Sequence, residues 1–327
     1  MRERYGNALR LASTVGLDHQ TWLALRQQGI GSSDAAAAIG LSPYKSPLAL
    51  WLEKTGRKAP DDISGKDAVV WGTTLEPVLA RAYAERTGRK VRRVNAVLQH
   101  AEHRFMLANL DREVVGCEDG PGVLEIKTAG YHSTTQWEDG VPVAYQCQVL
   151  HQLVVTGHAW ADVAVLIGGQ DFRIYRIQRD DDKIADLIER EAAFWQAVET
   201  DQQPVPDGSD DAGRALQWLF PQDNGDTLDL TESSEFNALF GDLLAIRQRK
   251  EETEAIEARL KQQLQAALGS ATSAVFQGGK ISWKKSKDRL APDLERLNLE
   301  HPDLLQQYSK PVSGSRRFVI QTERSTA

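Results

Sequence analysis

Short stretches with helical character alternate with stop signals through the first 90 positions of the chain. Gly40, Gly56 and Gly88 each follow such a stretch, as glycine commonly does where a helix ends. Ser32 or Ser33 is a favoured N-cap for the alanine-rich stretch before Gly40. The pattern predicts a mainly helical beginning, with helices over 19–28, within 29–40, over 48–55 and over 68–86.

At Val91 the pattern changes to runs of β-branched and apolar residues separated by turn residues. Pro142 and Gly157 bracket a further helix, because proline suits the first helical turn and glycine the residue after the last. A mixed β-sheet flanked by helices, an α/β or α+β core, is therefore predicted. Its strands are expected over 91–99, 105–116, 123–128, 160–167 and 171–178, and its last helix over 182–198.

Proline, glycine and aspartate dominate residues 200–234, which predicts an acidic linker with at most one short helix around Leu216. Residues 235–268 carry an apolar stripe that a charged run at 247–254 interrupts. A continuous coiled coil, a helix hairpin and a helix lying across the first domain all remain open.

Beyond this helix we expect a β-hairpin over 275–285 and a final strand over 317–322. The predicted domains are a core of residues 1–200, a linker of 201–234 and a C-terminal helical and β-hairpin region of 235–327.

Composition adds limits on the class of protein. The 327 residues are 41% hydrophobic, enough for a real core, and the two cysteines exclude a disulfide framework or a four-cysteine metal site. No apolar run is long enough to cross a bilayer and none resembles a signal sequence, so we expect a cytoplasmic protein with no membrane partner.

The net charge of −7 argues at first against a polyanionic partner. However, residues 180–242 alone contribute −14, while the segments before and after them contribute +2 and +5. The acidity is therefore regional, and we expect the acidic segment to point away from any nucleic acid.

Glu125 and Lys127 lie two positions apart in an apolar strand, so their side chains share one face about 7 Å apart. This arrangement suits a hard metal ion beside a cation that assists hydrolysis. Asp111, on the preceding strand, falls nearly opposite if the two strands form a hairpin. Asp181 and Lys183 have the same acid-x-lysine spacing, but they lie in a charge run at a helix start, so we interpret them as surface residues without a catalytic role.

These residues resemble the PD-(D/E)xK nuclease signature, and the wider pattern resembles the YqaJ-type viral recombinases and lambda-exonuclease-like phage alkaline exonucleases. The motifs cover residues 26–148 in the family's order, and Leu110 stands where the superfamily often has proline. The matching stretches are Arg26 with Gly29–Asp34, Trp71–Pro77, Asp111 with Glu125 and Lys127, and Tyr145 with Gln148.

The resemblance implies a restriction-endonuclease-like core that holds Mg²⁺, or alternatively Mn²⁺. Its implied metal ligands are Glu76, Asp111, Glu125 and the Ile126 backbone carbonyl, with Lys127 activating water. Gln148 and Tyr145 share a helix face with Gln152 and are expected to line the site. Without the resemblance, this face is an ordinary solvated side of an amphipathic helix.

A second group of residues concerns the end of a DNA strand. Ser33 lies at a helix N-terminus that favours phosphate, and the resemblance assigns Ser33 and Arg26 to a 5′-phosphate pocket. Capping alone also explains the serine, and Asp34 beside it is unfavourable for an anion. The basic side chains of Arg89, Lys90, Arg92 and Arg93 form a candidate track for the DNA backbone.

Taken together, the resemblance implies an exonuclease that degrades the 5′-ended strand of linear duplex DNA and leaves a 3′ single-stranded tail. It further implies a ring-shaped homotrimer and a single-strand annealing protein as partner in phage-type recombination in a bacterial host cell. An endonuclease on the same core, and a catalytically silent DNA-binding or assembly module, are the alternatives. Lys280, Lys284, Lys285 and Lys287 around Trp283 form another basic cluster, for DNA or for a protein.

Overall fold

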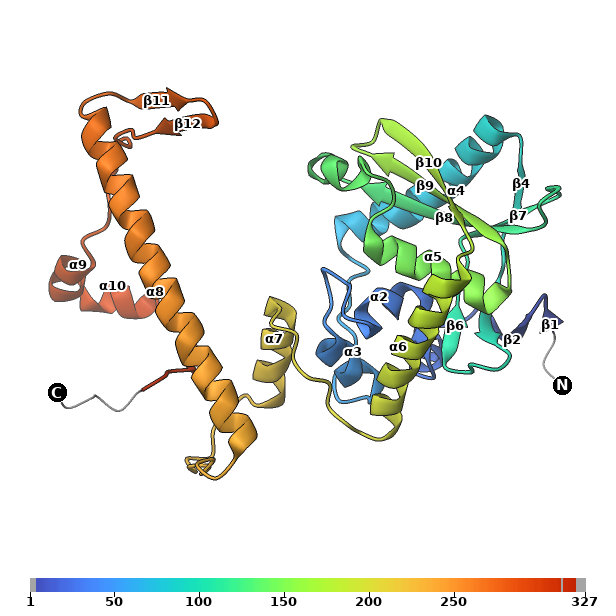
Figure 1. Cartoon of the computed structure of the whole chain (residues 1–327), viewed down its shortest axis with the longest axis horizontal. Coiled ribbons are helices and arrows are strands. Elements are labelled where there is room, and N and C mark those ends of the chain that lie inside the picture. Colours follow the sequence, from blue (N-terminus) through green and yellow to red (C-terminus); the bar gives the residue numbers. More distant parts are fainter. Residues whose placement is uncertain (1–3, 313, 322–327) are drawn as a thin grey trace. The chain divides into compact units, whose positions relative to one another are not determined.

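The computed structural model describes residues 4–312 and 314–321 (Figure 1). By its internal contacts the chain divides into two units, with the boundary between Phe220 and Pro221. Within the described residues, no helix is long and apolar enough to cross a membrane.

One five-stranded sheet of the first unit carries the predicted acid-x-lysine strand at its centre. Its order is β10-β9-β8-β7-β4, and β8 runs parallel to β9 while the other neighbours are antiparallel. The strands are β4 (Lys90–Arg92), β7 (Arg112–Val115), β8 (Gly122–Ala129), β9 (Trp160–Ile167) and β10 (Asp171–Gln178).

A second five-stranded sheet was not expected from the sequence. Its order is β1-β2-β5-β6-β3, with a parallel pair only between β6 and β3. The strands are β1 (Arg4–Tyr5), β2 (Ala8–Ser13), β3 (Ile30–Gly31), β5 (Ala96–His100) and β6 (Met106–Ala108). The α/β class with mixed sheets is confirmed, but the prediction of one sheet is wrong. The helices expected over 19–28, within 29–40, over 48–55 and over 68–86 are all present, and the short strands β1, β2 and β3 are added to them.

The stretch 105–116, predicted as one strand, divides at Asn109–Asp111 between the two sheets. In the same way, 91–99 divides into β4 and β5. Both stretches mix apolar and polar residues without a clear turn signal, so the pattern does not show where the chain changes sheets. The break frees Asp111 from any ladder, which matters for the site below.

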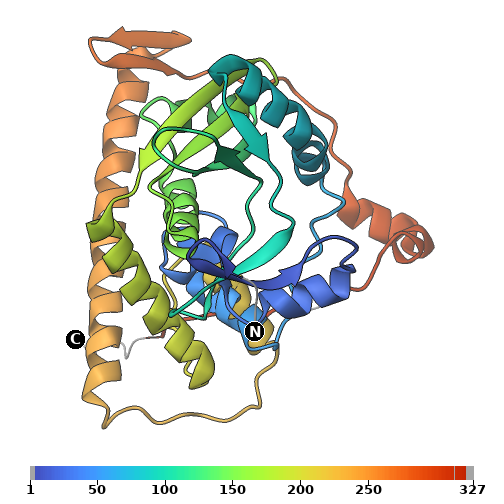
Figure 2. The same ribbon diagram turned by 90° about the vertical axis from the view of Figure 1, so that its right-hand side faces the viewer.

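Two helices cover opposite faces of the sheet that contains β8 (Figures 1 and 2). Leu124 and Ile126 pack with Leu79, Ala80 and Tyr83 of α4 (Asp67–Thr87). Val123 packs on the other face, where α5 (Val143–Thr156) supplies Val149, Leu150 and Leu153. By alternation, Glu125 and Lys127 point toward α5.

The described part of the first unit has seven further helical segments. They are α1 (His19–Arg26), η1 (Ser32–Asp34), α2 (Ala35–Ala38), α3 (Pro47–Lys54), η2 (Tyr131–Trp137), α6 (Asp181–Glu199) and α7 (Asp210–Leu219). Within the stretch expected as a linker, α7 packs on α3 through Ala215, and Asp211 accepts hydrogen bonds from the Ser46 backbone N–H and hydroxyl.

In the second unit, residues 234–268 form one continuous helix, α8 (Ser234–Leu268). The charged run does not break it, and within that run Lys250 pairs with Glu254 four residues on. The predicted hairpin is confirmed as β11 (Ser273–Phe276) and β12 (Gly279–Ser282), followed by α9 (Leu294–Glu300) and α10 (Pro302–Gln307). The strand predicted over 317–322 is absent from residues 317–321, and Thr322 lies outside the described residues.

Gly122, the first residue of β8, should be intolerant of a side chain. A Cβ there would lie 2.5 Å from the Trp160 ring, which is buried and stacked 3.9 Å under the Arg176 guanidinium. We therefore expect Gly122→Ala to lower the free energy of unfolding by about 2 kcal/mol, measured by chemical denaturation. Gly130→Ala is the control, since its Cβ meets no atom within 4 Å. Equal losses in the two variants would refute the packing argument.

Candidate active site

Glu125 and Lys127 form a closed network with Gln148 of α5. The Lys127 ammonium lies 2.7 Å from Glu125 Oε1 and donates a 3.0 Å hydrogen bond to Gln148 Oε1. The Gln148 amide in turn donates to Glu125 Oε1 at 2.6 Å. Strand alternation and helical spacing thus bring three of the predicted catalytic residues into direct contact.

Gln152 is a fourth member of this network. Its Nε2 donates 2.7 Å to Glu125 Oε2 and 3.3 Å to the Asn109 carbonyl, while its Oε1 is buried without a hydrogen-bond partner. The amide must present its N–H groups to Glu125, because the opposite orientation would set oxygen against carboxylate. The sequence placed Gln152 on the same helix face as Gln148, but it was not selected as a site residue.

Asp111 reaches the same region through the edge of β8. Pairing between β7 and β8 ends at Arg112 and Leu124, so the Ile126 N–H has no strand partner and donates 2.8 Å to Asp111 Oδ2. In an extended strand the N–H and C=O of one residue point to the same edge. The Ile126 carbonyl therefore lies on the edge where Asp111 sits.

The electrostatics of this cluster are unusual for a protein interior. Burial and the neighbouring Glu125 carboxylate raise the pKa of Asp111 to about 8. Burial by itself lowers the pKa of Lys127, but the adjacent Glu125 outweighs it and raises that pKa above its ordinary value. One buried ammonium thus lies among carboxylates that repel one another.

Glu76 lies on α4, on the opposite side of the sheet from Lys127. Its carboxylate pairs with the Arg112 guanidinium, which also donates to the Asp111 backbone carbonyl. Arg112 is buried. From the sequence it is a possible partner of the Asp111 carboxylate, but it binds the Glu76 carboxylate and the Asp111 backbone carbonyl instead. Among residues 4–312 and 314–321, no three His, Cys, Asp or Glu side chains form a group able to hold a metal ion.

The donors that do converge fit a hard divalent cation. Asp111 and Glu125 supply carboxylate oxygens and Ile126 a carbonyl oxygen, which are the ligand types of Mg²⁺ and Mn²⁺. Burial first, and then the charge of Glu125, raise the pKa of Asp111, and a bound divalent cation would offset both effects. Glu76 lies close enough for its charge to contribute to the raised pKa of Asp111, and Arg112 pairs with its Oε1.

Tyr145 supports the lysine from the start of α5. Its ring stacks on Trp137 with centroids 5.6 Å apart, and the Lys127 ammonium lies 4.8 Å from its centroid. The Tyr145 side chain therefore borders the Glu125–Lys127 network.

Arg26 and Ser33, predicted to bind a 5′-phosphate, are neighbours in the structure. The Arg26 guanidinium donates 3.1 Å to Ser33 Oγ and 2.9 Å to the buried Asp34 carboxylate. Lys54, which the sequence analysis did not single out, donates 2.8 Å both to Asp34 and to the Arg26 carbonyl. Asp34 is thus neutralised by two cations and orients Arg26.

The basic run after α4 divides into two kinds of residue. Arg89 pairs with buried Asp162 at 2.8 Å, and Arg92 pairs with buried Glu113. Lys90 and Arg93 are exposed and have no ion-pair partner among the described residues. Of the four, these two side chains are the better placed to meet a phosphate backbone.

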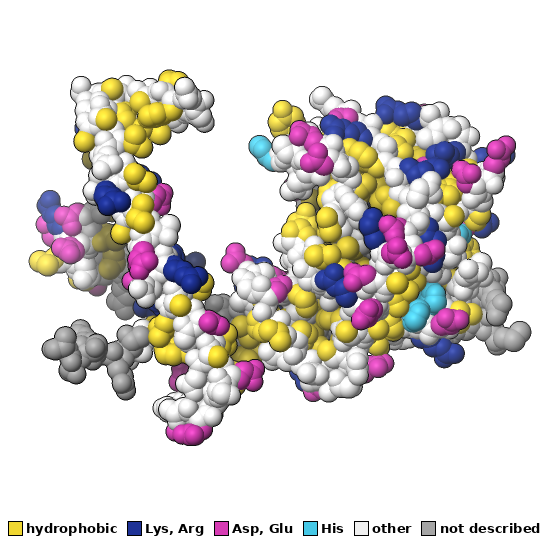
Figure 3. All heavy atoms as spheres, in the orientation of Figure 1, with side chains coloured by type: hydrophobic (Ala, Val, Ile, Leu, Met, Phe, Trp, Pro, Cys, Tyr) yellow, Lys and Arg dark blue, Asp and Glu magenta, His cyan; other side chains and the backbone are white. Residues whose placement is uncertain are grey.

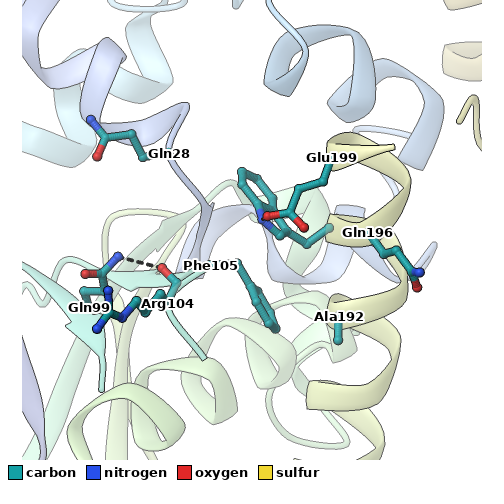
Figure 4. A pocket seen from close by; sticks show the side chains of 8 residues that line it. Gln28, Gln99, Arg104, Phe105, Ala192, Gln196 and Glu199 are labelled. Atoms are coloured by element: carbon teal, nitrogen blue, oxygen red, sulfur yellow. Dashed lines mark hydrogen bonds between the residues drawn. The ribbon is translucent and has the colours of Figure 1, made fainter. Parts of the chain in front are cut away.

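A pocket of about 360 Å³ lies apart from the carboxylate cluster, between α6 and the loop joining β5 to β6 (Figure 4). Gln28, Phe105 and Trp195 are among its lining residues, and Gln99 donates 2.7 Å to the Arg104 carbonyl at its rim. None of the predicted catalytic residues lines it.

The comparisons with known proteins agree with the sequence motifs. A family model described as the YqaJ-like viral recombinase domain matches residues 21–159. Over 315 residues the chain is 34% identical to the protein YqaJ of Bacillus subtilis (strain 168), covering 95% of this chain and 96% of that protein.

Among solved structures, the alkaline exonuclease LHK-Exo of Laribacter hongkongensis is 23% identical in sequence, with a TM-score of 0.48. The match covers 62% of this chain and 100% of the LHK-Exo chain. A phage related exonuclease of Haemophilus somnus 129PT is 12% identical, covers 54% and 96%, and has a TM-score of 0.39. With a relative of 34% identity along nearly its whole length, the chain belongs to the YqaJ-like viral recombinase family.

Proposed function

We propose that the chain is a metal-dependent 5′–3′ exonuclease that degrades one strand of linear duplex DNA to 5′-mononucleotides. The observation that carries this proposal is the contact of Glu125 and Lys127, within strand β8, with Gln148 of α5, beside Asp111. A divalent metal ion bound by the carboxylates would neutralise charge on the phosphate and on the leaving oxygen.

The residues of the chain have separate tasks in this reaction. Lys127 places a buried positive charge next to the reacting phosphate and orients the attacking water. Gln148 and Gln152 hold the Glu125 carboxylate in position through both its oxygens. Water forms the new bond to phosphorus as the bond to the 3′-oxygen breaks, and that oxygen leaves with a proton as a hydroxyl.

The Arg26 and Ser33 pair is proposed to bind the 5′-terminal phosphate. Each cleavage releases a 5′-mononucleotide and regenerates a phosphorylated 5′ end, so one pocket serves every cycle. Lys90 and Arg93 are proposed to contact the DNA backbone, and Tyr145 the scissile region. A homotrimeric ring, a single-strand annealing partner for the 3′ tail and a location in the host cytoplasm complete the proposal.

The deciding experiment compares linear duplexes with 5′-phosphate and 5′-hydroxyl ends, with Mg²⁺ and with EDTA. We expect Mg²⁺-dependent release of 5′-mononucleotides that is faster from the phosphorylated end, and no cutting of covalently closed circles. Cleavage of closed circles would instead identify an endonuclease. DNA binding without hydrolysis under any of these conditions would identify a catalytically silent binding module.

A further inference from the structure

The β11–β12 hairpin of the second unit carries side chains that the proposed active site does not use. Phe276 pairs with Gly279, and the Trp283 N–H donates 2.9 Å to the Thr272 carbonyl, which extends the ladder by one residue pair. Because side chains alternate along a strand, Phe276, Ile281 and Trp283 share one face. Lys280 and Lys284 share the other.

The aromatic rings on this hairpin are unusually open to solvent. Phe276 is 46% and Trp283 51% exposed, and apolar side chains are visible on the surface of the hairpin in Figure 3. At about 3.3 Å per residue, the four steps from Gly279, which pairs with Phe276, to Trp283 separate the two rings by roughly 13 Å along the hairpin. They are too far apart to stack on each other and far enough apart to meet two different planar groups.

The hairpin and the loop that follows it are also rich in basic side chains. Residues 270–290 hold five basic side chains and one acidic, in a chain whose net charge is −7. Within the described part of the chain, Lys280, Lys284 and Lys287 have no ion-pair partner, while Lys285 lies 3.1 Å from Asp288. Three cations on the helices of this unit do pair locally with acids, in Lys250–Glu254, Lys261–Glu257 and Arg296–Glu300.

We propose that this hairpin is a binding site for single-stranded nucleic acid. Exposed rings stack on bases, and only a single strand offers unstacked bases, while unpaired lysines attract its phosphates. The inference rests on the proposed function, because the hairpin would hold the 3′ tail that the exonuclease exposes. A protein ligand would need its own acidic and apolar side chains to match the lysines and rings of the hairpin. A single-stranded nucleic acid offers both kinds of group, phosphates and bases, in every nucleotide.

The test measures the anisotropy of fluorescein-labelled oligo(dT) of about 30 nucleotides, long enough to exceed one binding site, with the full chain in EDTA. We expect the triple variant Lys280→Gln, Lys284→Gln, Lys287→Gln to bind at least about tenfold more weakly near 100 mM salt. The slope of log affinity against log salt concentration should become shallower by about 2. Each phosphate contact to a single strand releases roughly 0.7 counterions, and the variant loses three lysines. Trp283→Ala should weaken binding about tenfold through lost stacking.

A matched control removes three positive charges from the same unit. Lys250→Gln, Lys261→Gln, Arg296→Gln lies on α8 and α9, and we expect it to change the affinity by less than about twofold, because exposed local pairs contribute little. Circular dichroism of each variant verifies that helix content is kept. Equal weakening by the control and hairpin triples would overturn the proposal.

Two further outcomes would also overturn it. Unchanged oligo(dT) affinity in Trp283→Ala would show that bases do not stack there, which leaves a protein or a general polyanion as ligand. Equal relative weakening for a blunt duplex would remove the preference for single strands. Binding is measured without metal, so the two proposals can fail separately. If the chain hydrolyses no DNA but its binding of oligo(dT) depends on the hairpin, only the proposed function is refuted. If the chain is an active nuclease but the hairpin variants bind oligo(dT) as the wild type does, only this inference is refuted.

Discussion

Replacing Lys127 with alanine is expected to lower kcat for nucleotide release by about a thousandfold while DNA affinity changes little. The Lys127 ammonium is the one cation in contact with both Glu125 and Gln148 in the described structure, and in the proposed reaction it would stabilise the charge that develops during hydrolysis. The measurement is single-turnover release from an end-labelled linear duplex with Mg²⁺, with binding followed separately in EDTA.

Lys183→Ala is the matched control, because Lys183 follows two aspartates in the sequence but is exposed at the start of α6. It should retain wild-type activity. If Lys127→Ala released nucleotides at the wild-type rate, the assignment of this cluster as the active site would be wrong.

Replacing Lys54 with methionine is expected to cost about 3 kcal/mol in the free energy of unfolding. The Lys54 side chain is only 4% exposed and donates to the buried Asp34 carboxylate and to the Arg26 carbonyl. Its loss leaves a buried carboxylate with Arg26 as its remaining cation. Urea unfolding followed by near-ultraviolet circular dichroism measures the change.

Lys58→Met is the control for this prediction, since Lys58 pairs with a largely exposed Asp61 and should cost less than about 0.5 kcal/mol. Adding Asp34→Asn to Lys54→Met should recover part of the loss, because no buried carboxylate then lacks its partner. A loss as small as that of Lys58→Met would contradict the assigned role of the buried pair.

The pH dependence of stability gives a second measure of the same site. Burial by itself raises the pKa of Asp34, but the charges of Lys54 and Arg26 outweigh it and hold that pKa below its usual range. A carboxylate with a lowered pKa stabilises the fold above its unfolded pKa of about 4, and this contribution disappears as the pH falls through the folded pKa. The difference in stability between the wild type and Asp34→Asn should therefore be constant above about pH 5 and shrink below about pH 4.

Local periodicity explains which parts of the site were predictable from the sequence. Strand alternation places Glu125 and Lys127 on one face, and helical spacing places Gln148 and Gln152 together. Both relations depend only on the geometry of a single element. The same reasoning identified the helices bounded by Gly88 and Gly157, which the structure confirms.

Long-range pairing explains what was missed. Asp111 contacts the Ile126 N–H because the pairing between β7 and β8 ends at Arg112 and Leu124. The apolar pattern of a strand predicts neither which strand lies beside it nor how far the pairing extends. Arg112 pairs with Glu76 across 36 positions, and Lys54 with Asp34 across 20. A buried charge pairs with whichever opposite charge lies nearby in the folded chain, because burying an unpaired charge costs much free energy.

The sequence by itself determined the α/β class, the strand that carries Glu125 and Lys127, the helix that faces it, and the family. Each of these follows from patterns that extend over a few turns or one strand, or from motifs in order along the chain. Only the tertiary structure decided that the strands form two sheets, that Gln152 supports Glu125, and that Glu76 is held by Arg112. The reason is that sheet order and ion pairing depend on which segments meet, and this is decided by packing of the whole core.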